Sequence, residues 1–193
     1  MAEPLEPTET IVAVPSALAP PSLPHWPPGG EVCRLPATAS FPEIVLSSYL
    51  DETQLDALRA LISKDLSEPY SIFTYRRFLH GWPEFTLLAH AGGALVGAIV
   101  CKSEVRERSR RVRGYVAMLA VEAAYRRCGV GRRLAVEAFN RMAVTCQELS
   151  METEATNTPA IKLYESLGFV KDKRLIRYYL NGGDAWRLKV VLR

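Results

Sequence analysis

The sequence has no long hydrophobic run, although 48% of its 193 residues are hydrophobic. Its apolar stretches fall far short of the roughly 18 consecutive residues that a membrane-spanning helix needs. At the amino terminus, glutamates and prolines stand where a secretory signal would have a basic start and an apolar core. We therefore expect one soluble globular domain that has no secretory leader and no membrane partner.

Cysteine and histidine are also scarce. The four cysteines form neither C-x-x-C pairs nor a dense framework, and they are Cys33, Cys101, Cys128 and Cys146. This spacing predicts reduced thiols in a protein of the cytoplasm, with the nucleus as a second location. The three histidines are scattered without the spacing of metal ligands, and they are His25, His80 and His90. We expect no metal site.

Two common nucleotide-binding loops are missing as well. The pattern G-x-x-x-x-G-K-[ST] does not occur, and the G-x-G at Gly129 and Gly131 is not completed to G-x-G-x-x-G. These absences argue against a P-loop nucleoside triphosphatase and against a dinucleotide-binding fold.

Proline is abundant in only one region, because ten of the thirteen prolines fall within residues 1–42. A segment of this composition cannot bury enough apolar surface to offset its ordering entropy, so we expect 1–42 to be a disordered acidic tail. Residues 43–193 then form the domain. The tail carries a net charge of −3 and the domain +6, which together give the total of +3. A basic domain suits a phosphate-bearing cofactor or a polyanion such as ribosomal RNA.

The most informative stretch is a basic, glycine-containing bend between an apolar run at 115–121 and a helical pattern. Glycine at 129 and 131 lets a ligand approach the main chain, and the first amides of the following helix have no partner inside that helix. The helix dipole adds about 0.3–1 kcal/mol of preference for an anion there. Arginines surround the bend, at Arg126, Arg127, Arg132 and Arg133. The alternative is an ordinary solvated turn.

Periodic patterns predict the remaining elements. Leu55, Leu58 and Ile62 define one face of a helix that begins after Asp51, and Ser71 is typical of the cap of a second helix. Strands are expected near 44–46, 85–89, 95–102, 115–121, 149–153, 169–180 and 186–192, and two further helices after the bend and after residue 158. The predicted order is β-α-α-β-β-β-α-β-α-β-β.

Several of these stretches resemble the GCN5-related N-acetyltransferases (GNAT), which bind acetyl-coenzyme A. Arg126-x-x-Gly129-x-Gly131 matches the [QR]-x-x-G-x-[GA] pyrophosphate loop of that family. The resemblance is strongest to its NatC-type amino-terminal acetyltransferases, over LSEPYSI (66–72), YVAMLAV (115–121), METE (151–154), LYESLGF (163–169) and KRLIRYYLNG (173–182). It implies an α/β GNAT fold with a mixed, mostly antiparallel seven-stranded sheet flanked by about four helices.

The resemblance also implies a set of acetyl-CoA contacts. The expected cofactor-binding residues are Leu119, Val121, Arg126, Arg127, Gly129, Val130, Gly131, Arg132 and Asn157. Main-chain groups around Leu119 and Val121 would hold the thioester and the pantetheine arm. No metal is needed for such a reaction.

Acetyl transfer to an amine needs a base, because an α-amino group titrates near pH 8 and is mostly protonated at neutral pH. Glu152 is the candidate general base and Tyr164 the candidate general acid for the leaving thiolate, as in the family. The residues alone leave two alternatives open. Glu152 could be a polar position of a half-exposed strand, and Tyr164 could be a core tyrosine.

The acceptor is inferred from the resemblance alone. Residues expected to hold the substrate are Glu68, Pro69, Tyr70, Met118, Tyr178 and Tyr179. The implied substrates are peptide or nascent-chain amino termini that start with Met followed by Leu, Ile, Phe or Trp. Auxiliary NatC subunits and the ribosome are candidate partners, whereas DNA is not expected. The alternatives are a GNAT with a lysine or small-amine acceptor, and a non-catalytic acetyl-CoA-binding paralogue.

Overall fold

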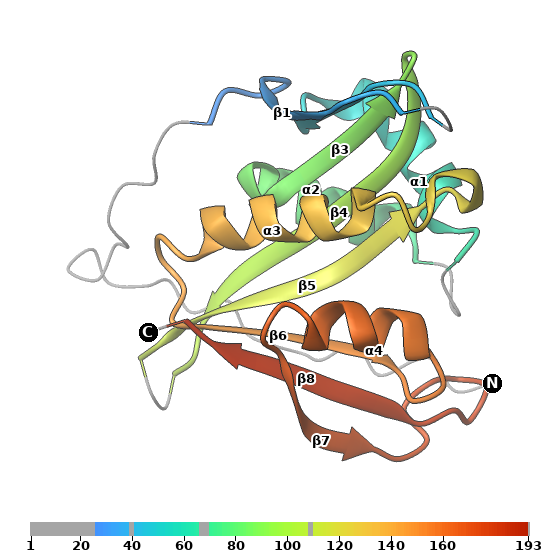
Figure 1. Ribbon diagram of the computed structural model, residues 1–193. Helices are drawn as coiled ribbons and strands as arrows, with labels where there is room; N and C mark the ends of the chain where they lie inside the picture. The colour runs from blue at the N-terminus through green and yellow to red at the C-terminus, as the bar shows by residue number, and fades with distance from the viewer. Residues whose placement is uncertain (1–25, 39–40, 66–69, 108–109, 193) are drawn as a thin grey trace.

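The protein folds around one eight-stranded sheet in the order β1-β2-β3-β4-β5-β6-β8-β7 (Figure 1). The computed structural model describes residues 26–38, 41–65, 70–107 and 110–192. The strands are β1 (Glu31–Leu35), β2 (Ile44–Ser48), β3 (Thr86–Ala91), β4 (Ala94–Val105), β5 (Val112–Val121), β6 (Glu148–Glu154), β7 (Val170–Leu175) and β8 (Ala185–Val191). All neighbouring strands are antiparallel except β5 and β6, which confirms the expected mixed, mostly antiparallel sheet.

Helices cover both faces of the sheet. They are α1 (Leu55–Ile62), α2 (Ile72–Gly81), α3 (Val130–Met142) and α4 (Thr158–Glu165), with 3-10 turns at Glu52–Gln54, Pro83–Phe85 and Ala123–Tyr125. In Figure 1, α1 and α2 lie behind the sheet, whereas α3 and α4 lie in front of it. The predicted apolar face of α1 is buried, and Leu134, Ala138 and Met142 of α3 are fully buried on the other side. None of the described helices is long and apolar enough to span a membrane.

The expected strand number was wrong by one, because residues 31–35 form β1 at the edge of the sheet. This strand pairs antiparallel with β2, and Arg34 forms ion pairs with Glu31 of the same strand and with Glu43 just before β2. The strand is stabilised by pairing with β2. The overall composition of a proline-rich segment cannot reveal such a contact. The expected disorder of 1–42 is therefore wrong for 31–35. Residues 1–25 lie outside the described residues, and their disorder stays a prediction.

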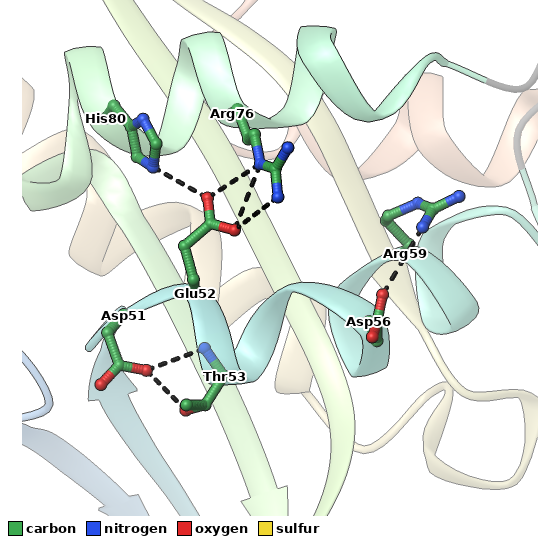
Figure 2. Close-up of polar contacts among 7 residues, drawn as sticks. All are labelled: Asp51, Glu52, Thr53, Asp56, Arg59, Arg76 and His80. Atoms are coloured by element: carbon green, nitrogen blue, oxygen red, sulfur yellow. Dashed lines mark hydrogen bonds and ion pairs between the residues drawn. The ribbon is translucent and has the colours of Figure 1, made fainter.

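The first two helices are joined by a cluster of charged side chains (Figure 2). The carboxylate of Asp51 accepts a hydrogen bond from the Thr53 amide and so caps the 3-10 turn that leads into α1. Next to it, Glu52 accepts bonds from Arg76 and from His80, both on α2. All of these groups are partly exposed, so the cluster adds little to stability.

The feature that positions the site is the divergence of β5 from β6. The two strands pair only from Arg113↔Glu148 to Tyr115↔Ser150, and beyond Tyr115 they separate (Figure 1). A bulge follows at once, since Val116 pairs with Cys101 and Met118 with Val100, which leaves Ala117 unpaired. Because pairing with β6 ends at Tyr115, the later half of β5 presents one main-chain edge that has no partner in β6.

Candidate active site

A cavity of about 200 Å³ lies between the diverging strands. Its walls come from the second half of β5, from β6, from α4 and from the loop between β7 and β8. The lining residues include Asp65, Tyr70, Tyr115, Met118, Leu119, Glu152, Glu154, Asn157, Tyr164, Tyr178 and Tyr179. Glu152 and Tyr164, which the sequence suggested as base and acid, thus lie in one cavity.

Glu152 is held by two neighbours. Its side chain is 7% exposed, and its Oε1 atom accepts a hydrogen bond from Nε of Arg187 at 2.7 Å. The two residues face each other across the β6–β8 ladder. The buried hydroxyl of Tyr115 donates a second hydrogen bond to the carboxylate, and burial raises the pKa of Tyr115 well above its usual value. Such bonds fix the orientation of the carboxylate.

Tyr164 is buried, with 2% of its surface exposed, and its ring packs against Phe169 at 5.4 Å between centroids. Burial raises the pKa of Tyr164, so its phenol keeps its proton through the neutral and mildly alkaline range. A phenol that stays protonated can donate a proton or a hydrogen bond into the cavity. The structure therefore places a core tyrosine at the cavity wall, which combines the two interpretations of this residue.

The glycine bend lies exposed at the start of α3. Gly129 has a φ of +86°, which favours glycine, and it is the N-cap residue without a side-chain cap bond. The Arg133 amide bonds to the Gly129 carbonyl at 2.9 Å, so the amides of Val130, Gly131 and Arg132 precede the first intrahelical bond. A Cβ on Gly131 would meet Val121 only at 3.5 Å, an ordinary contact. The protein's own packing therefore does not require glycine at 131.

The arginines around the bend bond mostly to the protein itself. Arg126 donates to the Val121 carbonyl and to Asp65, and Arg132 donates to Ser166 at the end of α4. Arg127 has a φ of +65°, and no hydrogen bond or ion pair of its guanidinium to another described residue is seen. Direct contact of Arg126 or Arg132 with a cofactor stays a prediction.

Of the other expected cofactor residues, some line the cavity and some do not. Leu119 lines the cavity, whereas Val121 is not among its lining residues and its carbonyl is used by Arg126. Asn157 lines the cavity and also caps α4, since its Oδ1 atom accepts from the Ala160 amide at 3.1 Å. The side-chain oxygen of Asn157 is thus engaged, and its amide nitrogen is the group that remains for a ligand.

Four of the six expected substrate residues line the cavity. Tyr70 approaches from the start of α2, Met118 from β5, and Tyr178 and Tyr179 from the loop after β7. The rings of Tyr178 and Tyr179 meet edge to face at 5.2 Å. Glu68 and Pro69 lie outside the described residues, so their role stays a prediction.

Sequence reasoning missed Tyr115, Arg187 and Asp65. Tyr115 is the last residue of β5 that pairs with β6, and Arg187 of β8 is the cross-strand neighbour of Glu152. Both placements depend on strand register, which had no signal in the sequence. Among the residues that the structure describes, no group of three or more His, Cys, Asp or Glu side chains could hold a metal ion.

Comparison with known proteins agrees with this geometry. Residues 55–169 match the model of the acetyltransferase (GNAT) family. The chain belongs to the GNAT family. Within it, the chain is similar to N-alpha-acetyltransferase 30 of Homo sapiens, with 56% identity over 146 residues, which are 75% of this chain and 40% of the human protein. The GNAT fold that the resemblance implied is thus confirmed.

For two further GNAT relatives, the matched region covers a larger share of the relative's own length. N-alpha-acetyltransferase 30 of Saccharomyces cerevisiae is 46% identical over 144 residues, which are 72% of this chain and 81% of the yeast protein. A crystal structure of the NatC complex bound to Gag peptide and CoA contains a chain with 44% identity and a TM-score of 0.74, covering 78% of this chain and 99% of that one. The present chain thus spans less than half of the human relative and most of the yeast one.

Proposed function

We propose that this protein is an N-alpha-acetyltransferase of the NatC type, which moves acetyl from acetyl-CoA to the free amino group of a peptide. The observation that carries the proposal is the cavity between β5 and β6, which is lined by both Glu152 and Tyr164, together with the exposed glycine bend that follows the end of β5. The names of the related proteins and the CoA and peptide in the NatC crystal structure support the same activity.

The residues present fit a diphosphate and a pantetheine arm. Gly131 is not needed for packing, and the amides of Val130, Gly131 and Arg132 can donate to phosphate oxygens at the positive end of α3. The unpaired edge of β5 near Leu119 can hydrogen-bond an extended arm in place of a strand. When bound, acetyl-CoA supplies the acetyl thioester, and the protein supplies alignment and proton transfer.

Glu152 removes the proton that an α-ammonium group carries, either directly or through one water. Hydrogen bonds from Arg187 and from Tyr115 favour the orientation in which this carboxylate lines the cavity. General base catalysis of this kind is worth about 10²–10⁴-fold. Tyr164 remains protonated and can give its proton to the departing thiolate.

The cavity walls suit an apolar amino-terminal residue pair. Met118 and the rings of Tyr70, Tyr178 and Tyr179 line the cavity and offer apolar surface to such a pair. We infer substrates that begin with Met followed by Leu, Ile, Phe or Trp. Auxiliary NatC subunits, the ribosome and a cytoplasmic or nuclear location are part of the same proposal.

The test is acetylation of peptides that differ only in their first two residues. A Met-Leu peptide is expected to be acetylated at least about tenfold faster than a Ser-Ala peptide, as one filled apolar pocket is worth that much. Equal rates would contradict the specificity. Acetylation of lysine or of a small amine alone would instead indicate another acceptor, and CoA binding without any turnover would indicate a non-catalytic paralogue.

A further inference from the structure

Two ion pairs join the end of α1 to the segment that leads from β5 into α3. Lys64 pairs with Glu122 and Asp65 pairs with Arg126, over sequence separations of 58 and 61 residues. Arg126 is the first residue of the glycine bend, and Asp65 is a lining residue of the cavity. One ion pair thus connects the expected cofactor site with the expected substrate site.

The guanidinium of Arg126 has two different partners. Its Nε atom donates to the Val121 carbonyl at 2.8 Å, which fixes the group at the end of β5. One terminal nitrogen lies 2.7 and 2.6 Å from the two carboxylate oxygens of Asp65. An anion at the bend would find this cation already committed to a carboxylate.

We propose that Asp65 and Arg126 are a positioning pair that couples occupation of the cofactor site to capture of the substrate's ammonium group. The inference rests on the proposed function. With a diphosphate at the bend, Arg126 shares its charge between the phosphates and Asp65, so the carboxylate becomes less neutralised. Asp65 then attracts a cationic amino terminus in the cavity more strongly. By thermodynamic reciprocity, such a peptide also strengthens cofactor binding.

The pair is suited to this role because breaking it does not threaten the fold. The side chains of Arg126 and Asp65 are 49% and 39% exposed, and pairs of that exposure add little to folding stability. A matched control is the pair of Arg76 and Glu52, at 43% and 41% exposure, which joins α2 to the turn before α1 (Figure 2). Neither residue of the control pair lines the cavity.

The experiment measures the Kd of a fluorescent Met-Leu peptide by anisotropy, with and without saturating coenzyme A. For the wild type we expect binding at least about fivefold tighter when coenzyme A is present, the low end of typical coupling. Asp65→Asn is expected to bring this ratio close to one, and Glu52→Gln to leave it unchanged. Arg126→Lys keeps the charge but loses the fork that reaches Val121 and Asp65 together, so it is expected to lower the ratio as well.

A second peptide separates charge from shape. The same peptide with its amino group already acetylated carries no cation there, and we expect it to show no coupling in any variant. An unchanged ratio in Asp65→Asn, at a wild-type melting temperature, would overturn the proposal, and so would equal coupling for both peptides. Failure of the proposed function gives a different result, since the wild type would then acetylate no peptide, and the inference would fall with it.

Discussion

The two walls of the cavity, one formed by β5 and the other by β6, are built in different ways. The β5 wall is enclosed, because β5 pairs with β4 from Val112 to Val121 with one bulge and residues of both hydrophobic clusters pack on its two faces. The β6 wall carries Glu152 and Glu154 and is continued by β8 and then by β7, whose side chains are almost all exposed. We infer that the first wall holds the cofactor through its main-chain groups and that the more polar second wall carries the proposed proton transfer.

The largest effect that this comparison predicts is on the β6 wall. Glu152→Gln keeps the shape of the side chain and removes the base, so kcat is expected to fall by about 10²–10⁴-fold. Steady-state acetylation of a Met-Leu peptide measures the loss. Calorimetric titration with coenzyme A is the control, and its Kd is expected to stay at the wild-type value. Unchanged turnover would exclude Glu152 as the base.

A substitution at the point where the walls meet is expected to damage the fold. A Cβ on Gly114 would lie 2.4 Å from Leu149 and 2.5 Å from Met142, both buried. Gly114→Ala should lower the free energy of unfolding by about 1–3 kcal/mol through overpacking. Urea unfolding followed by circular dichroism measures this change, and a variant as stable as the wild type would contradict the packing at the seam.

The bend is expected to behave in the opposite way. Gly131→Ala adds a methyl group that the protein itself can accommodate, so stability should change by less than about 1 kcal/mol. The methyl group would stand in the path of a ligand, and the Kd for coenzyme A is expected to rise about tenfold, or 1.4 kcal/mol. Wild-type affinity in this variant would show that the diphosphate does not approach the main chain there.

The smallest expected effect is a pH dependence. Because burial raises the pKa of Tyr164, folding holds its proton more tightly than the unfolded chain does. The stabilisation is complete below the unfolded pKa of about 10 and is lost as the pH rises above it. Urea midpoints measured from pH 8 to 11 should therefore decline less steeply for Tyr164→Phe than for the wild type. Parallel curves would show that the phenol is not desolvated.

The helices and most strands could be predicted because their signals are local. The Ser71 side chain accepts a hydrogen bond from the Thr74 amide as the N-cap of α2. The spacing of Leu55, Leu58 and Ile62 predicted the buried face of α1. What could not be predicted depends on partners distant in sequence. Strand β1 needs the edge of β2, and the orientation of Arg126 is set by Asp65 at the end of α1.

For the proposed catalytic residues too, contacts between segments distant in sequence could not be predicted. Glu152 and Tyr164 could be selected from a family pattern, yet nothing in the sequence indicated that Arg187 and Tyr115 would hold the Glu152 carboxylate. These contacts follow from the register of β6 with β8 and from the last pair between β5 and β6. Register is fixed by the packing of the whole sheet.

The central claim is that the cleft between β5 and β6 delivers acetyl to an α-amino group. The most direct measurement is mass spectrometric mapping of the acetyl group on a Met-Leu peptide that also contains an internal lysine, after incubation with the protein and acetyl-CoA. We predict acetyl on the α-amino group alone, and its loss in Glu152→Gln. Acetyl on the lysine with an unmodified amino terminus would contradict the account.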